Sequence, residues 1–328
     1  MQNNYFNIFY ITRDGLREKI MVATKKDILS LLDFSREEIT SVLESASDLK
    51  KNRLKSDPKA FKDRTGVMIF EKPSLRTRIT FETAINELGG HPINLSGETI
   101  GMGKRESVED VARNLERWVH LIIARTFSHR TVELLARSSR IPVINALTDK
   151  FHPCQALAFA LTLYENIGES RNVKVVFVGD SNNVCNSIMG LCAKVGYDFT
   201  VVCPPSYAPK DDIMKPCLEA AAETGSRIVV THDLLGAIKD ATALYTDVWT
   251  SMGQEGETEK RKRDFTGYQL NEKVLSLAPS GVLVSHCLPA HRGEEITSEV
   301  LDSEHSIAFD EAENRLHVQK AIILHLFS

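Results

Sequence analysis

Short, almost uninterrupted apolar runs recur along the chain from residue 66 onward. The first has the sequence GVMIF at 66–70, and similar runs follow at 91–95, 119–125, 141–145, 173–179, 198–203, 226–231, 241–248 and 281–287. Runs rich in Val, Ile, Leu and Phe, with little polar alternation, are typical of strands that are covered on both faces of a parallel sheet. The pattern therefore predicts parallel rather than antiparallel sheets.

Between these runs the apolar residues take the spacing of an amphipathic helix. Phe81, Ile85 and Leu88 form one such set, and Val184 and Ile188 begin another. Residues three or four positions apart lie on one face of a helix, which can then cover a sheet. Because strand and helix alternate over the whole chain, we predict an α/β fold of doubly wound parallel sheets.

The apolar runs fall into two sets, separated by a long helical stretch from Pro153 to about Asn166, in a chain of 328 residues that is long enough for two domains. We predict a first domain over 21–150, a second over 151–310 with a linking helix between the sheets, and an N-terminal extension over 1–20. Periodicity alone lets the last helix, over 311–328, complete the second domain or cross back. We predict that it returns to the first domain.

Charge and cysteine usage exclude several classes of function. The chain has 40 Lys and Arg against 44 Asp and Glu, a formal charge of −4, so no general basic field exists to attract nucleic acid or an anionic membrane. The six cysteines lack paired short spacings, a pattern typical of reduced intracellular thiols. No apolar stretch reaches membrane-spanning length, and the first 20 residues lack the features of a secretory signal. We expect a cytoplasmic protein.

The sequence FEKPSLRTRITFE at 70–82 joins a predicted strand to a predicted helix. Ser74 stands at the N-cap position, where free N–H groups and the helix dipole favour an anion. Arg76 and the Thr77 hydroxyl add charge-assisted hydrogen bonds of the kind that bind phosphate. The stretch therefore predicts a phosphate site, although a capped helix with solvated arginines would have the same sequence.

Two further groups of polar side chains follow predicted strands of the first domain. Arg125 ends the run LIIAR, where an arginine either binds a ligand or pairs with a carboxylate. His152 and Gln155 flank Pro153, which favours the first helical position. A histidine there can donate to a developing carbonyl oxygen, but capping or packing histidines are equally common.

The second domain has its own candidates at strand ends. GDSNN at 179–183 lacks the glycines of a dinucleotide-binding turn, which counts against NAD, and Asn182 and Asn183 offer neutral donors and acceptors. Asp247 and Ser251, in DVWTSMG, suit an α-ammonium group, although a turn-forming aspartate is an equal alternative. Cys287 and Leu288 precede Pro289, where a cis peptide can occur. Cys287 is expected to line a pocket or to be inert.

Metal ligands are not predicted. Neither the pair His152 and Cys154 nor the group His286, Cys287 and His291 has the spacing of a structural zinc site. We therefore expect no metal and no other cofactor.

The motifs SLRTR, ART, HPCQ, GDSNN, DVWTSMG and HCLPAHRGEE, taken in this order, resemble those of the aspartate and ornithine carbamoyltransferase family over residues 25–328. DVWTSMG together with HCLP is similar to the ornithine branch. The resemblance implies carbamoyl transfer from carbamoyl phosphate to the δ-amine of L-ornithine, giving L-citrulline, in arginine biosynthesis or breakdown. An acceptor other than ornithine is the alternative within the family. An NAD-dependent oxidoreductase and an inactive binding paralogue are the alternatives outside it.

The similarity also implies which residues would contact each substrate. Carbamoyl phosphate would contact Ser74, Leu75, Arg76, Thr77, Arg125, His152, Gln155 and Arg315. Ornithine would contact Asn183, Asp247, Ser251, the Met252 backbone, Cys287 and Leu288. Catalysis would depend on Arg125, His152, Cys287 and Arg315.

The resemblance also implies at least a trimer, with one departure from the family pattern. In GETIGMGKRES, Gly101 stands where the family commonly has a glutamine or histidine that reaches a neighbouring subunit's site. Glycine has no side chain to do so, and Lys104 and Arg105 are the nearby candidates to replace it.

Overall fold

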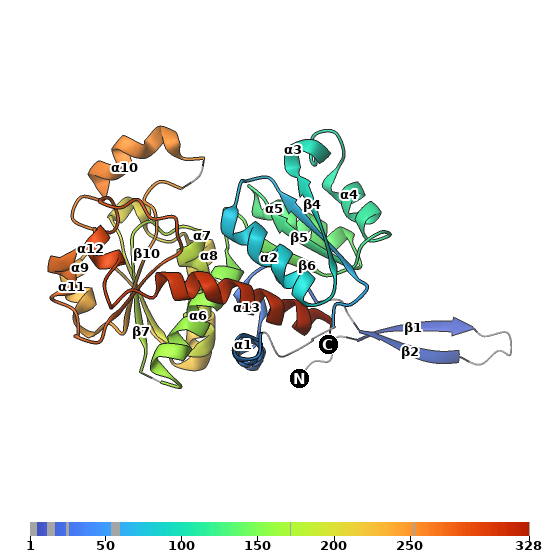
Figure 1. Ribbon diagram of the computed structural model, residues 1–328, viewed down its shortest axis with the longest axis horizontal. Coiled ribbons are helices and arrows are strands. Elements are labelled where there is room, and N and C mark those ends of the chain that lie inside the picture. Colours follow the sequence, from blue (N-terminus) through green and yellow to red (C-terminus); the bar gives the residue numbers. More distant parts are fainter. Residues whose placement is uncertain are drawn as a thin grey trace.

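The computed structural model describes residues 5–11, 17–23, 26–53, 60–170, 172–251 and 253–327. Two lobes, each built on a parallel sheet, lie side by side, and two long helices run where they meet (Figure 1). The predicted fold of two parallel-sheet α/β domains is confirmed. In the described part of the chain no helix combines the length and the apolarity that a membrane crossing needs.

The first sheet has four parallel strands in the order β4-β3-β5-β6. The central strands β3 and β5 are almost fully buried, whereas the edge strand β4 is largely accessible. β6 begins two residues after the start of its predicted run, because Pro142 has no N–H for the ladder. The strands are β3 Thr65–Phe70, β4 His91–Ser96, β5 Leu121–Arg125 and β6 Val143–Leu147.

The second sheet has five parallel strands in the order β11-β10-β7-β8-β9. The order reverses between β7 and β10, and in such sheets ligands bind at the carboxyl ends beside this reversal. The strands are β7 Lys174–Val178, β8 Asp198–Val202, β9 Ile228–Thr231, β10 Ala243–Thr246 and β11 Leu283–His286.

Helices cover the faces of both sheets (Figure 1). In the first domain they are α1 Arg36–Lys51, α2 Leu75–Glu87, α3 Gly97–Ile100, α4 Val108–Leu115 and α5 His129–Ser138. In the second they are α7 Asn183–Val195, α8 Asp211–Thr224, α9 Leu234–Ala237, α10 Thr258–Asp264, α11 Glu272–Leu275 and α12 Ser298–Leu301. Short 3-10 helices occur at Leu31–Asp33, Pro205–Tyr207, Ile238–Asp240 and Glu255–Glu257.

Two helices join the domains: α6 Pro153–Ile167 and α13 Ala308–Phe327. The final helix packs on α1, α2 and α6, so it returns to the first domain as predicted. It starts three residues earlier than expected, at Ala308 instead of Glu311. Nearly every residue of α13 from Glu311 to Ile323 is buried, because both lobes contact it. One hydrophobic core therefore runs through both domains, from Phe34 and Phe81 to Phe177 and Phe199.

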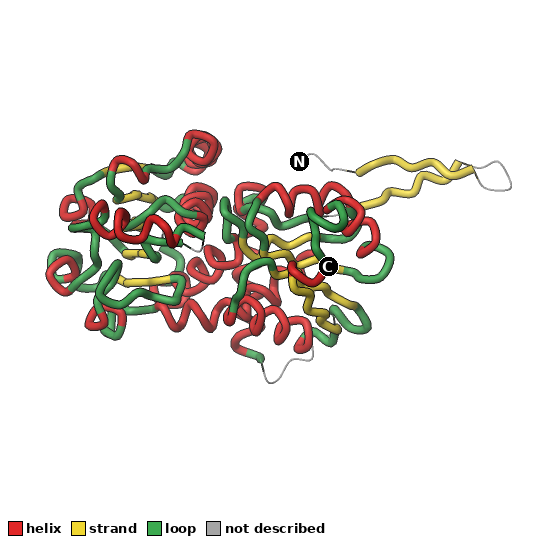
Figure 2. Tube along the Cα trace, turned by 90° about the horizontal axis from the view of Figure 1, so that it is seen from above, coloured by secondary structure: helices red, strands yellow, loops and turns green. Residues whose placement is uncertain are grey.

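The predicted N-terminal extension contains an antiparallel hairpin of β1 Tyr5–Ile11 and β2 Arg17–Ala23. The hairpin projects away from the two lobes in both views (Figures 1 and 2). The proposed boundary after residue 20 falls inside β2. Asp27, a few residues after the hairpin, contacts the first sheet, because its carboxylate accepts from Val143 N–H.

Candidate functional site

One large cleft of about 1450 Å³ lies at the carboxyl ends of both sheets. Its wall includes every predicted site residue that the structure describes, from both domains. Met252 lies outside the described residues. The side chains predicted for carbamoyl phosphate and those predicted for ornithine thus share one cleft, as a transfer between two bound substrates requires.

The wall from the first domain is the start of helix α2. Ser74 has an extended backbone and its Oγ accepts from Thr77 N–H at 3.2 Å, an N-cap as predicted. The side chain of Leu75, the first helical residue, is 73% exposed, so its backbone N–H is the group that it can offer an anion. Thr77 is buried, and its Oγ1 accepts from Arg315 Nη2 at 3.0 Å.

Three arginines converge on this helix start. Arg125 at the end of β5 and Arg315 on α13 are buried, Arg76 is half-buried, and none of the three forms an ion pair with a carboxylate in the described part of the chain. Burial, followed by the repulsion of Arg315 and Arg76, lowers the pKa of Arg125 to about 10. Buried cations without counter-charges are costly, so this wall is suited to a multiply charged anion.

His152 lies at the N-cap of α6, where its backbone N–H donates to Ser187 Oγ at 2.7 Å. Its side chain is buried, and Nδ1 has no hydrogen-bond partner among the described residues. Burial, reinforced by Arg315 and Arg125, lowers the pKa of His152 well below its ordinary value. The imidazole is therefore neutral near pH 7, and its Nδ1 is free to hydrogen-bond a ligand.

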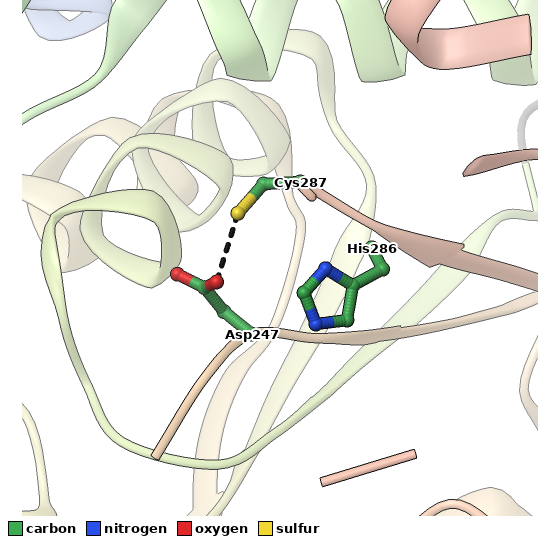
Figure 3. Close-up of side chains that lie close together, drawn as sticks. All are labelled: Asp247, His286 and Cys287. Carbon is green, nitrogen blue, oxygen red and sulfur yellow. Dashed lines mark hydrogen bonds between the residues drawn. The ribbon is translucent and has the colours of Figure 1, made fainter. Parts of the chain in front are cut away.

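The wall from the second domain centres on Asp247, directly after β10. Its Oδ1 accepts from Cys287 Sγ–H at 2.8 Å (Figure 3), and its Oδ2 accepts from Asn182 Nδ2 at 2.6 Å. Asn182 also caps helix α7 through its Oδ1. Asn183 instead donates from Nδ2 to the Thr148 carbonyl of the first domain, at 2.5 Å. Asn182, which we had not assigned to ornithine, is thus the direct neighbour of Asp247.

The loop after β11 completes this wall. The Leu288–Pro289 peptide is cis, and Leu288 has a φ of 53°. The sequence had left the cis form open as an alternative. Ser251 lines the cleft, and its N–H donates to Gln254 Oε1 at 3.1 Å.

Asp247, His286 and Cys287 bring potential metal ligands within 4.8 Å of one another (Figure 3). However, His286 Nε2 contacts Glu295 Oε1 at 2.9 Å, and its Nδ1 accepts from Leu288 N–H at 2.8 Å. Both ring nitrogens are thus engaged within the protein. These contacts indicate that His286 stabilises the loop that carries Cys287.

Comparison with known proteins identifies the family. The model of the aspartate/ornithine carbamoyltransferase carbamoyl-P binding domain matches residues 26–165, and that of the Asp/Orn binding domain matches residues 171–326. The chain belongs to the aspartate/ornithine carbamoyltransferase family.

Individual members of this family are similar over almost their whole length. The ornithine carbamoyltransferase of Methanosarcina mazei is 49% identical over 92% of this chain and 99% of its own. The structure of the Pyrococcus furiosus ornithine carbamoyltransferase has a TM-score of 0.89 at 43% identity, covering 93% of this chain and 97% of its own. An N-acetyl-L-ornithine transcarbamylase also matches, with a TM-score of 0.84 at 32% identity over 92% and 99%. The fold alone therefore does not distinguish acceptors within the family.

Gly101, where the chain departs from the family pattern, has a backbone conformation that favours glycine. Its φ of 62° is left-handed, and a Cβ there would lie 2.9 Å from Arg105 Cβ. A side chain at this position would thus be strained in this loop conformation. Lys104 and Arg105 are exposed on the same loop.

Glu311 is a second polar residue that sequence reasoning missed. It is fully buried on α13, where its carboxylate accepts hydrogen bonds from Gln155, Tyr245 and Ser285. Burial raises its pKa to about 7, against the opposing effects of these donors and of Arg315. A glutamate one helical turn before Arg315 was the available signal, but nothing in the periodicity marks such a residue as buried.

Cys287 provides a test of the acceptor wall by its reactivity. Burial and then the Asp247 carboxylate raise the pKa of the Cys287 thiol well above its ordinary value, and the thiolate is the form that reacts. Alkylation of Cys287 by iodoacetamide at pH 8, followed by peptide mass spectrometry, is expected to be slower than that of free cysteine. Asp247→Asn should accelerate it. An unchanged rate in Asp247→Asn would contradict the assigned contact.

Proposed function

We propose that this chain transfers the carbamoyl group of carbamoyl phosphate to the δ-amine of L-ornithine, forming L-citrulline and inorganic phosphate. One observation carries the proposal. Arg76, Arg125 and Arg315, which have no carboxylate partner in the described chain, face the same cleft as the Asp247 carboxylate. A doubly charged phosphate suits the first group and an amino acid's α-ammonium suits the second.

Carbamoyl phosphate is held by the first wall. Backbone N–H groups at the start of α2, the Ser74 and Thr77 hydroxyls and the Arg76 guanidinium bind its phosphate. Arg125 bridges the phosphate and the carbonyl oxygen, which Thr77, His152 and Arg315 also approach. These donors are fixed before the reaction, so they stabilise the developing oxyanion without reorganising.

Ornithine is held by the second wall. Asp247, Asn183, Ser251 and the Met252 backbone bind its α-amino and α-carboxylate groups, and the δ-amine lies beside Cys287 and Leu288. The amine must lose its proton before it attacks, and a partly buried pocket disfavours the ammonium form. Holding both substrates in line supplies much of the remaining acceleration.

The reaction then needs one addition and one elimination. The neutral δ-nitrogen attacks the carbonyl carbon and forms the new C–N bond, while the carbonyl oxygen gains negative charge. The carbonyl re-forms as the C–O bond to phosphate breaks, and phosphate leaves with the electron pair. The nitrogen loses its extra proton to the departing phosphate or to solvent, so no cofactor is required.

The direct test is citrulline formation by the purified protein. We expect kcat/KM for ornithine to exceed that for acetylornithine, putrescine and aspartate by at least about 100-fold, because a matched polar site rejects acceptors that leave its groups unpaired. If only a different amine were carbamoylated, the assigned acceptor would change, but the assignment as a carbamoyltransferase would stand. The absence of citrulline above background would remove the proposal.

Two other functions find less support. Gly179 at the end of β7 is followed by a helix start that carries Asn182 and Asn183 instead of further glycines, so an oxidoreductase that binds NAD lacks its phosphate turn. An inactive paralogue would not retain all four donors to the carbonyl oxygen. We also propose, on the family resemblance, a cytoplasmic homotrimer or multiple of trimers that acts in arginine biosynthesis.

A further inference from the structure

Gln155 on α6 contacts two side chains of opposite charge. Its Nε2 donates to Glu311 Oε1, and its Oε1 accepts from Arg315 Nη1. Arg315 offers only donors, so the Gln155 atom that contacts its Nη1 must be the amide oxygen, which leaves the NH₂ group for Glu311. Reversing the amide would place two oxygens together on one side and two N–H groups together on the other. The Gln155 amide is therefore held in one orientation.

Glu311 is itself held from three directions. Besides Gln155, Tyr245 OH on β10 donates to Oε1 at 2.8 Å, and Ser285 Oγ on β11 donates to Oε2. All four side chains are buried. β10 leads directly to Asp247, and β11 leads directly to Cys287. The carboxylate thus connects the strands of the ornithine wall to the helix that carries Gln155.

The connection continues into the carbamoyl phosphate wall. Arg315, which Gln155 orients through Nη1, donates from Nη2 to Thr77 Oγ1 at 3.0 Å. Its Nε has no partner among the described residues. The contacts with Gln155 and Thr77 together fix the plane of the Arg315 guanidinium. Without the Gln155 oxygen only the contact with Thr77 would remain, while the Arg125 guanidinium repels that of Arg315.

We infer that Glu311 is a positioning residue that fixes the Gln155 amide with its oxygen toward Arg315, and thereby aims Arg315 at the carbonyl oxygen of the bound substrate. The inference rests on the proposed function for the identity of that substrate. Glu311 touches no substrate itself, since it is fully buried behind Gln155. It acts by accepting a hydrogen bond, so a glutamine in its place retains part of the effect through its own oxygen.

The experiment compares Glu311→Leu and Glu311→Gln with the wild type. Glu311→Leu is expected to lower kcat/KM for carbamoyl phosphate by about 10- to 100-fold, the range for losing a hydrogen bond to a charged group. Glu311→Gln should recover most of that loss. The inhibition constant of inorganic phosphate should change less than about threefold in both, because Ser74 and Arg76 hold phosphate without Gln155.

A double-mutant cycle separates positioning from a general loss of structure. Glu311→Leu should have little further effect on a Gln155→Ala background if it acts through Gln155. Glu313→Leu, on the same helix but with a largely exposed carboxylate, is the matched control and should stay within twofold of wild type. Additive effects, or equal losses for carbamoyl phosphate and inorganic phosphate, would overturn the inference. A wild type without citrulline formation would instead remove the proposed function.

Discussion

Replacing Arg125 by glutamine is expected to lower kcat/KM for citrulline formation by about 10²- to 10³-fold, the usual cost of removing one fixed donor to an oxyanion. The same substitution is expected to stabilise the ligand-free protein. Burial and repulsion from Arg315 and Arg76 lower the pKa of Arg125 to about 10, so the folded state holds this charge at a cost that an amide avoids.

The two effects are measured separately. Steady-state kinetics give the loss of activity, and calorimetry in phosphate-free buffer should show a Tm higher by about 2–6 °C, given about 2–4 °C per kcal/mol for a domain of about 150–250 residues. Addition of phosphate should stabilise the wild type more than the variant, because phosphate binds the wild type more tightly.

Arg130→Gln is the matched control for Arg125→Gln. Arg130 lines the same cleft but is exposed and lies 3.3 Å from Glu133, so its loss should change kcat/KM less than twofold. Equal activity of the Arg125→Gln variant and the wild type would show that Arg125 is only a structural cation.

Replacing Asp247 by asparagine is expected to raise KM for ornithine by at least about 30-fold, since the loss of one partner of a buried charge pair typically costs about 2–5 kcal/mol. The substitution keeps the shape of the side chain, but it directs an NH₂ group at Cys287 or at Asn182, both of which donate to the carboxylate. KM for carbamoyl phosphate should change less than threefold, because its binding groups come from the opposite wall.

Asp212→Asn is the control for the acceptor wall. Asp212 also lines the cleft, but it is exposed and pairs with Lys150 at 2.8 Å, where an ion pair contributes little. Its KM values should match those of the wild type. If Asp247→Asn raised both KM values equally, Asp247 would have a general structural role instead of binding ornithine.

The alternation of apolar runs and helical spacing was enough to predict the architecture. Each buried strand is short and continuous in Val, Ile and Leu, since both of its faces are covered, and such a run is readable one segment at a time. The N-cap at Ser74 was predictable for the same reason, because its hydrogen bond to Thr77 N–H spans only three residues. The pairing of β1 with β2 was not predicted.

Contacts between distant segments could not be predicted from local pattern. The assignment of Asn182 rather than Asn183 to Asp247 depends on how the end of β7 faces the end of β10. Glu311 likewise meets Gln155 only because α13 crosses back between the domains, 156 positions along the chain from its partner. The donors around this carboxylate come from distant segments, so the residues next to Glu311 in the sequence do not indicate that it is buried and hydrogen-bonded.

The sequence by itself determined two parallel-sheet domains, the helix start that suits a phosphate, and, through ordered motifs, the family. Only the tertiary structure decided that both sets of polar groups face one cleft and that Arg125, Arg315 and Arg76 lack carboxylate partners within the described chain. It also decided that a buried glutamate contacts Gln155. The physical reason is that hydrophobic periodicity and capping are local properties of the chain, whereas desolvation and charge pairing depend on which segments fold against each other.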